Sequence, residues 1–420
     1  MHPPPLARFL LPRLPFYYGW VILGCVCLAG FARQGAAVAV LSIFVVPMTE
    51  EFGWSRTEMS GAVSVGGVLA AMISPWIGPI LDRSGARLVL CLAVLGTGLA
   101  TMALSLTPSL AVFYLLFCFA RMNWAGPFDL GLYGALNSWF IARRARAMSI
   151  ATIAQTSGLV ILPLIAQAAM QAYGGWRAGW VAIGGTLLLV GFVPSWLLLV
   201  RRPEDVGLRP DQRTAAPGAG ATSAAPEPRF SRAQALRTPA FWLLALFTAL
   251  IFPVQAGVSL HLAPHLIERG LSPVAAATVI SSFSALSALA TFSVGFLPRR
   301  WPVRTMLAGS GLLCGVGALA LIDIGTMAGA TMAAGLFGMG VGTVLTLLPV
   351  AWADYFGRAS YGAIRGVALS MQVLAQATGP LMSGALRDAS GDYTRSLTLF
   401  GVLGILAALI ACVARPPATR

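Results

Sequence analysis

The chain has 420 residues, of which 57% are hydrophobic and only 10% are charged, and its mean hydropathy is +0.80. A soluble domain carries about 25% charged residues, so the composition excludes an ordinary water-soluble enzyme. The 28 basic residues are all arginines and exceed the 14 acidic residues, which gives a net charge of +14. In so apolar a chain this excess indicates arginines that face a membrane rather than a nucleic-acid partner.

Twelve apolar stretches are long enough to cross a bilayer, since one crossing needs about 20 residues of helix. They are 17–46, 57–81, 88–106, 110–140, 147–170, 178–200, 239–266, 273–298, 303–323, 327–355, 363–386 and 395–414. The predicted fold class is therefore an all-α membrane protein with twelve transmembrane helices in two six-helix bundles.

The polar segments between these stretches divide the chain into five parts. The predicted domains are a cytosolic tail 1–16, an N-terminal bundle 17–200, a linker 201–238, a C-terminal bundle 239–414 and a tail 415–420. The first 16 residues contain five prolines and no cleavage-type ending, so they are interpreted as a tail and not as a signal peptide. The proline-rich segment 201–238 is interpreted as a flexible linker.

The distribution of arginines predicts the orientation. With both termini inside, 21 arginines, Arg144 and Arg365 among them, fall in cytosolic segments, where they are interpreted as anchors that face an anionic leaflet. Five arginines fall in outer segments, and Arg33 and Arg121 remain inside helices. This bias predicts cytosolic N- and C-termini by the positive-inside rule.

A constant offset of 217 residues relates the two bundles. It places Gly53 on Gly270, Pro163 on Pro380 and Gly174 on Gly391, so helix ends and turns repeat. Parallel repeats of this kind are expected to form a substrate site between them, near the middle of the membrane. Capping boxes at Ser55 to Glu58 and Ser231 to Gln234 predict helix starts at these two positions.

The loop between the second and third predicted helices carries a recognisable motif. It reads Gly78-Pro79-Ile80-Leu81-Asp82-Arg83-Ser84-Gly85-Ala86-Arg87 and resembles the G-x-x-x-D-R-x-G-x-R/K loop of the major facilitator superfamily. The resemblance implies that Gly78, Asp82, Arg83, Gly85 and Arg87 control conformational gating at the cytosolic ends of the helices. The alternative is a tight basic turn with only a topological role.

Further stretches resemble one branch of that superfamily. Tyr17 to Trp20, Glu51 to Arg56 and Arg202 to Pro210 look like segments of bacterial monocarboxylate-transporter-like and oxalate/formate-antiporter-like members. The branch implies a transporter in a bacterial inner membrane. The chain departs from animal monocarboxylate carriers because it has no lysine and because 273–298 carries no charged pair, so their substrate residues cannot be transferred.

Three charges lie deep inside predicted helices: Arg33 in the first, and Arg121 and Asp129 in the fourth. At 1.5 Å per residue both arginines lie close to the bilayer midplane, where an ionised side chain costs at least about 2.5 kcal/mol unless it has a partner or a wet cavity. Their counterparts at the 217-residue offset, Leu250, Gly338 and Thr346, are uncharged. The net charge of +1 favours a small monoanion. The alternative is that Asp129 neutralises an arginine as a structural pair.

Asp129 is also predicted as a proton-coupling residue, because anion loading would shift its protonation. Polar residues on the cavity-forming helices are candidates for orienting the substrate: Gln34, Asn123, Tyr133, Gln255 and His261. For each of them a helix-to-helix hydrogen bond is the alternative. His261 and His265 are four residues apart, and we interpret them as interfacial or pH-sensing residues rather than as a metal pair, since no carboxylate or thiol accompanies them.

The predicted function is secondary active transport of a small organic anion, a monocarboxylate, by alternating access with possible proton coupling. The sequence offers no phosphate-binding loop and no catalytic set, so we expect no enzyme activity, cofactor, metal or nucleic-acid partner, and a monomer in the bilayer. One alternative is a major facilitator exporter of drugs or metabolites. Another, from a different class, is a membrane receptor or a membrane-embedded enzyme.

Overall fold

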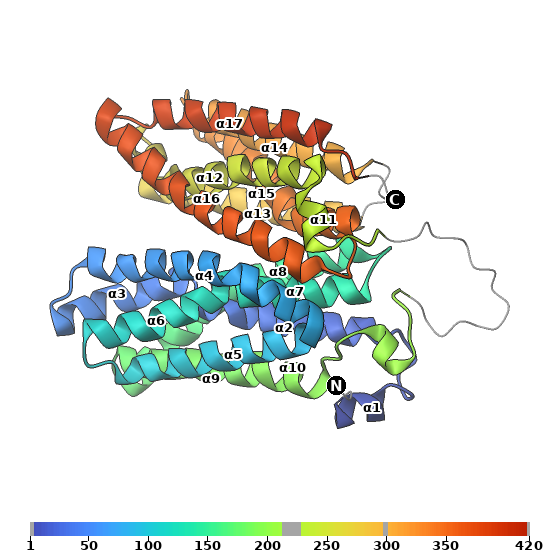
Figure 1. Cartoon of the computed structure of the whole chain (residues 1–420). Coiled ribbons are helices and arrows are strands. Elements are labelled where there is room, and N and C mark those ends of the chain that lie inside the picture. Colours follow the sequence, from blue (N-terminus) through green and yellow to red (C-terminus); the bar gives the residue numbers. More distant parts are fainter. Residues whose placement is uncertain (1–3, 212–227, 297–300, 418–420) are drawn as a thin grey trace. The chain divides into compact units, whose positions relative to one another are not determined.

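The computed structural model describes residues 4–211, 228–296 and 301–417, and within these ranges all regular structure is helical (Figure 1). The chain divides into two compact units. Unit 1 comprises the described residues of Met1–Glu227 together with Arg358–Ser370, and unit 2 those of Pro228–Gly357 together with Met371–Arg420. In each unit the helices run side by side as a bundle, with close pairs such as α4 with α6 in unit 1 and α13 with α15 in unit 2 (Figure 1).

The helices of unit 1 precede residue 207. They are α1 (Pro5–Leu10), α2 (Gly19–Arg33), η1 (Gln34–Ala36), α3 (Val38–Phe52), α4 (Arg56–Ser84), α5 (Ala86–Ala103), η2 (Leu104–Leu106), α6 (Leu110–Ala125), α7 (Pro127–Trp139), α8 (Arg144–Tyr173), α9 (Trp176–Thr186), η3 (Leu187–Phe192), α10 (Val193–Leu198) and η4 (Pro203–Val206). Here η1, η2 and η4 are 3-10 helices and η3 is a π-helical segment.

The helices of unit 2 are longer and fewer. They are α11 (Arg232–Leu236), α12 (Pro239–Glu268), α13 (Pro273–Phe296), α14 (Val303–Ala320), α15 (Met327–Phe356), α16 (Tyr361–Ser390) and α17 (Thr394–Val413). The helix α16 is shared, because its residues up to Ser370 pack within unit 1 and its residues from Met371 pack within unit 2.

Eleven helical segments in the described residues are long and apolar enough to cross a membrane. The helix α16 is not one of them, although it has 30 residues and matches the eleventh predicted span. Gln372, Gln376 and Pro380 lower its hydropathy. With α16 the architecture is the predicted twelve-helix membrane fold. The largest difference in bounds is in the first span, which continues to Phe52 rather than ending at 46.

The structure repeats with the offset found in the sequence. The matched elements are α4 with α13, α5 with α14, α6 and α7 with α15, and α8 with α16, and in each pair the first residues lie 217 positions apart. Gly53, Gly270, Gly174 and Gly391 all have positive φ, between 69° and 90°, which only glycine adopts readily. The repeated glycines therefore terminate equivalent helices in the two bundles.

The two repeats differ at the helices that carry the buried charges. The first span is interrupted between α2 and α3, and the fourth is interrupted at Gly126, between α6 and α7. Their counterparts α12 and α15 are continuous helices of 30 residues each. Arg33 lies at the first interruption, and Arg121 and Asp129 flank the second. The unrepeated charges thus coincide with unrepeated breaks in the backbone.

Both predicted capping boxes are present. The Ser55 hydroxyl accepts a hydrogen bond from the Glu58 N–H (3.1 Å), and the Glu58 carboxylate accepts one from the Ser55 N–H (2.7 Å). Ser231 and Gln234 make the same reciprocal pair at the start of α11. Each box satisfies two N–H groups that the helix itself leaves free.

The family-like aromatic residues before the first span have a structural role. The Tyr17 hydroxyl donates to the Trp139 carbonyl (2.8 Å), the Tyr18 hydroxyl donates to the Leu198 carbonyl (2.9 Å), and Trp139 Nε1 donates to the Val200 carbonyl (3.2 Å). Burial raises the pKa of both phenols, so they remain neutral donors. These bonds tie the start of α2 to the ends of α7 and α10.

The segment 201–238 is more ordered than a flexible linker. Residues 201–211 pack within unit 1, where Arg358 forms an ion pair with Glu204 and Arg201 pairs with Asp205 (3.3 Å). Residues 228–238 contain α11. These two parts of the predicted linker carry short helices, η4 in the first and α11 in the second. Residues 212–227 lie outside the described residues.

Replacing Asp211 with alanine is expected to loosen this packing. The Asp211 carboxylate accepts hydrogen bonds from the N–H groups of Ile141 and Ala142 (both 2.6 Å) and of Arg143 (3.3 Å), just before α8. Each such bond to a charged group contributes about 1.5–3 kcal/mol. We expect faster tryptic cleavage after Arg209 and a lower melting temperature. Asp205→Ala is the control, because it removes a partly exposed pair worth at most about 1 kcal/mol.

Candidate functional site

The two helix breaks in unit 1 are held together by Arg33, which is buried, and by Arg121, which is half-buried. Arg33 ends α2, and its Nε donates to the carbonyl of Trp124 near the end of α6 (2.8 Å). Arg121 lies on α6, and its Nη1 donates to the carbonyl of Ala36 at the end of η1 (3.4 Å). A carbonyl at the end of a helix has no partner within that helix and is costly inside a bilayer. Each arginine therefore stabilises the break in the other helix.

Both arginines contact the face of the Trp124 indole. The guanidinium carbon of Arg121 is 3.8 Å from the ring centroid and that of Arg33 is 4.6 Å from it. The Trp124 Nε1 donates to Gln34 Oε1 (3.3 Å), which fixes the ring. A cation over an indole face is stabilised by about 2 kcal/mol when it is desolvated. The ring thus partly replaces the water that both cations lack.

Asp129 supplies the negative charge of the site. Its Oδ2 lies 3.7 Å from Arg33 Nη2, and its Oδ1 lies 3.3 Å from Arg365 Nη2. Asp129 is in the first turn of α7, where the helix dipole favours an anion, and Arg33 is in the last turn of α2, where it favours a cation. We call Arg33, Arg121, Asp129 and Arg365 the charged cluster.

Arg365 corrects the sequence-based count of arginines. It was assigned to the cytosolic anchors, but it is only 1% exposed and contacts Asp129 from the first turns of α16. Arg144 was assigned in the same way and is 2% exposed. A position near the end of a helix does not determine whether the side chain faces the interior or the solvent. The side chains of these two arginines face the interior of the protein.

Gln155 is a site residue that the sequence did not single out. It is buried on α8, and its Oε1 accepts from Arg33 Nη1 (3.0 Å). The contact depends on small residues, because a Cβ on Gly30 would lie 2.6 Å from Gln155 Cγ and one on Gly158 would lie 2.5 Å from the Phe31 carbonyl. A glutamine within a long apolar run was the available signal.

The remaining predicted substrate residues separate into two groups. In unit 1, Gln34 contacts Trp124, Tyr133 is buried on α7, and Asn123 is bonded to its own helix through the Phe119 carbonyl (3.1 Å). Gln255 and His261 belong to unit 2, where Gln255 Oε1 accepts from Gln376 Nε2 (3.3 Å). The structure therefore brings Gln34 to the charged cluster, whereas the side-chain hydrogen bond of Asn123 stays within its own helix.

The charged cluster carries more positive than negative charge. The cluster contains three guanidinium groups and one carboxylate, so the formal sum is +2 rather than the +1 expected before Arg365 was included. In the described part of the chain, Arg121 has no carboxylate within ion-pair distance, and its Nε is buried without a hydrogen-bond partner. A cation in this state is suited to bind an anion.

The Gly78 to Arg87 loop lies elsewhere in unit 1, against the start of α16. The Asp82 carboxylate accepts from the N–H groups of Gly362 and Ala363, both at 2.7 Å. Gly78 makes the approach possible, because a Cβ there would lie 2.1 Å from the Gly362 carbonyl oxygen. Asp82 thus satisfies free N–H groups at the N-terminus of α16.

The other residues of this loop bind to the end of the first bundle. Arg87 Nη2 donates to the Trp196 carbonyl (3.0 Å), and Gly85 adopts φ 83° where a Cβ would clash with Arg201. Arg83 contributes its carbonyl, which accepts from Arg201 Nη1 (3.3 Å). The 217-residue offset places Asp82 and Arg83 on Arg299 and Arg300, which lie outside the described residues.

The comparisons with known proteins agree with this architecture. The sequence model of the Major Facilitator Superfamily matches residues 22–380. The chain belongs to the major facilitator superfamily. It is 28% identical to monocarboxylate transporter 11 of Mus musculus over 90% of this chain and 83% of that protein. It is also 27% identical to the membrane sensor protein UhpC of Escherichia coli K12, over 58% of each chain.

Solved structures of this superfamily share the fold. The human organic anion transporter MFSD10 (TETRAN) superposes with a TM-score of 0.72 at 15% identity, over 94% of this chain and 99% of that chain. The charged cluster lies in unit 1 of this major facilitator protein.

Proposed function

We propose that this major facilitator protein is a secondary active transporter of a small organic anion, a monocarboxylate, which moves by alternating access in a bacterial inner membrane with both termini in the cytosol. The observation that carries the proposal is Arg121. Its guanidinium carbon lies 3.8 Å from the Trp124 ring centroid within the charged cluster, whose formal charge is +2, and no carboxylate of the described chain lies within ion-pair distance of it.

The geometry favours a carboxylate as the ligand of Arg121. A planar guanidinium binds a carboxylate through two parallel hydrogen bonds, and these bonds are strongest where water is excluded. The names of two similar proteins, a monocarboxylate transporter and an organic anion transporter, support the same class of substrate. A cationic drug would be repelled by the cluster, which disfavours the exporter of cationic drugs.

We assign Asp129 the role of a charge partner that competes with the substrate for Arg33. An incoming carboxylate that binds Arg33 and Arg121 would draw Arg33 away from Asp129, which still has Arg365 as a partner. Protonation of Asp129 would instead forfeit both ion pairs. The contacts therefore support exchange of ion pairs at Asp129 more strongly than they support proton transport by this residue.

Small monocarboxylates are expected to raise the melting temperature of the purified protein, because a ligand that binds only the folded state stabilises it by mass action. The measurement is a thermal-shift screen of monocarboxylates, dicarboxylates, sugars and cationic drugs. We expect stabilisation by monocarboxylates in the wild type and its loss in Arg33→Ala and Arg121→Ala. Absence of any anion effect, or equal responses of the wild type and both variants, would refute the anion site.

Transport itself is tested in liposomes. A transporter accumulates the stabilising anion inside the vesicle. A membrane sensor, which is what the name of the relative UhpC describes, would bind the anion without accumulating it. Binding without uptake would therefore retain the site and replace transport by sensing.

A further inference from the structure

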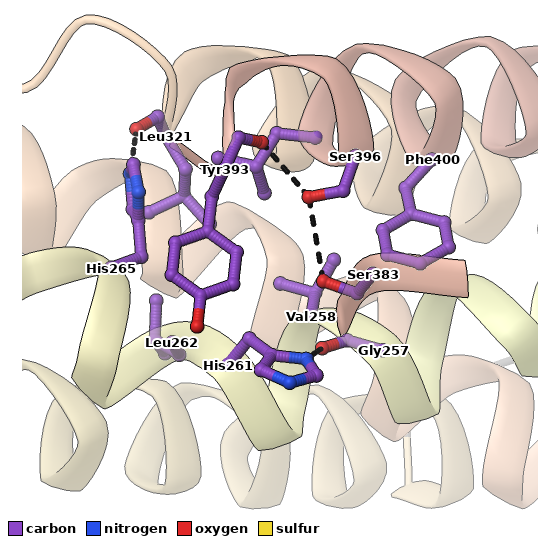
Figure 2. Close-up of a pocket in the computed structure, with 11 residues that line it drawn as sticks. Gly257, Val258, His261, Leu262, His265, Leu321, Ser383, Tyr393, Ser396 and Phe400 are labelled. Carbon is purple, nitrogen blue, oxygen red and sulfur yellow. Dashed lines mark hydrogen bonds between the residues drawn. The ribbon is translucent and has the colours of Figure 1, made fainter. Parts of the chain in front are cut away.

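Unit 2 contains a small pocket at one end of its bundle, lined by residues of α12, α16 and α17 together with Leu321 and Tyr393 (Figure 2). Two histidines of α12, His261 and His265, are among its lining residues, and both rings lie beside Tyr393 (Figure 2). The Ser383 hydroxyl donates to the Ser396 hydroxyl (3.3 Å), which donates to the Tyr393 carbonyl (2.9 Å). The surface that lines the pocket is nevertheless almost entirely apolar.

The two histidines differ in their freedom to bind a proton. His265 is 2% exposed, and its Nε2 lies 2.6 Å from the Leu321 carbonyl, so this nitrogen carries a hydrogen that it donates. His261 is half-buried, and its Nδ1 lies 3.2 Å from the Gly257 carbonyl of its own helix. A carbonyl can only accept, so Nδ1 of His261 is the donor and Nε2 retains a free lone pair.

The charged groups around the pocket leave His261 without a fixed ion pair. From α12 these are Glu268, which pairs with Arg387 (2.9 Å), and Arg269, which donates to the Thr394 hydroxyl (3.2 Å). From α16 they are Arg387 and Asp388, which lie 3.7 Å apart. From the following turn Asp392 contributes a carboxylate whose pKa is lowered by hydrogen bonds from Thr394. None of these charged residues lines the pocket.

We propose that His261 is a proton-binding site of the transporter, separate from the anion site in unit 1. The Nε2 lone pair binds a proton from the aqueous phase to give an imidazolium, and the same proton leaves from Nε2 in the reverse step. The inference rests on the proposed transport function and assigns the coupling proton to unit 2 instead of Asp129.

Direct titration tests the site. The chain has only three histidines, His2, His261 and His265, so the full-length protein labelled with ¹⁵N-histidine gives three sets of ring signals. His261→Asn and His265→Asn assign two of them. We expect the His261 signals to move from the neutral to the doubly protonated ring between pH 8 and pH 5, and those of His265 to keep one neutral tautomer. A His261 ring that stays neutral throughout this range would overturn the proposal.

Liposome uptake gives a second readout. We expect an inwardly directed proton gradient to stimulate anion uptake at least tenfold in the wild type and less than twofold in His261→Asn. The control His2→Asn is expected to behave as the wild type, and Asp129→Asn to retain the response to the gradient in whatever uptake it has. Equal stimulation of His261→Asn and the wild type would refute the coupling role. If no anion binds at all, the proposed function fails, while the titration still decides the histidine site.

Discussion

Replacing Arg121 with glutamine is expected to weaken anion binding at least tenfold and to lower the melting temperature less than Arg33→Gln does, because it removes the contacts with Ala36 and Trp124 but no ion pair. The variant removes a guanidinium that binds the substrate but breaks no ion pair with a carboxylate in the described chain. A hydrogen bond to a charged group contributes about 1.5–3 kcal/mol, and 1.4 kcal/mol corresponds to a factor of ten in affinity. Arg121→Lys keeps the charge but loses the planar stacking on Trp124, so we expect intermediate affinity.

The matched variant Arg33→Gln should behave differently. It leaves Asp129 with Arg365 as its one partner in the charged cluster and also removes the bonds to Trp124 and Gln155. Breaking a buried ion pair costs about 3–5 kcal/mol, so the melting temperature should fall together with uptake. Thermal unfolding and anion titration of both variants separate the two roles. Arg177→Gln, which breaks an exposed pair with Glu51, is the control, and wild-type affinity in Arg121→Gln would contradict the proposed site.

Periodic and repeated features of the fold were predictable from the sequence. Apolar length predicts all twelve spans, including α16, whose glutamines lower its hydropathy, and the 217-residue offset places α16 on α8. The Ser55 and Ser231 capping boxes were also predictable, because they depend on residues only three positions apart. Local chemistry and strict repetition determine these elements without knowledge of tertiary contacts.

The site was only partly predictable, because it depends on contacts distant in sequence. Arg33, Arg121 and Asp129 could be found as charges inside apolar runs, and Gly126-Pro127 was an available signal for the break in the fourth span. Arg365 could not, since it is 236 residues from Asp129 and lies in a segment that resembles a helix end with a basic anchor. Arg33 donates to a carbonyl near the break in the fourth span, and Arg121 donates to a carbonyl at the break in the first span. These two contacts could be recognised only from the path of the backbone.

The loop at Asp82 gives the second large expected effect. Asp82→Asn is expected to lower the rate of uptake at least fivefold, with anion affinity within about twofold of wild type, because Asp82 lies outside the charged cluster. The carboxylate stabilises two N–H groups at the start of α16, and each bond to a charged acceptor contributes about 1.5–3 kcal/mol. An amide oxygen accepts more weakly and carries no charge to interact with the helix dipole.

Gly362→Ala tests the same contact by steric means. Its Cβ would lie 2.4 Å from the Gly78 carbonyl oxygen and 2.8 Å from Asp82 Oδ1, so the backbones of α4 and α16 must separate within unit 1. Gly384→Ala is the matched control on the same helix, because no atom lies within 4 Å of its added Cβ. We expect Gly362→Ala to reproduce the slow uptake of Asp82→Asn and Gly384→Ala to transport normally. Normal uptake rates in both Asp82→Asn and Gly362→Ala would leave the loop with a topological role alone, because gating requires that this contact control the rate.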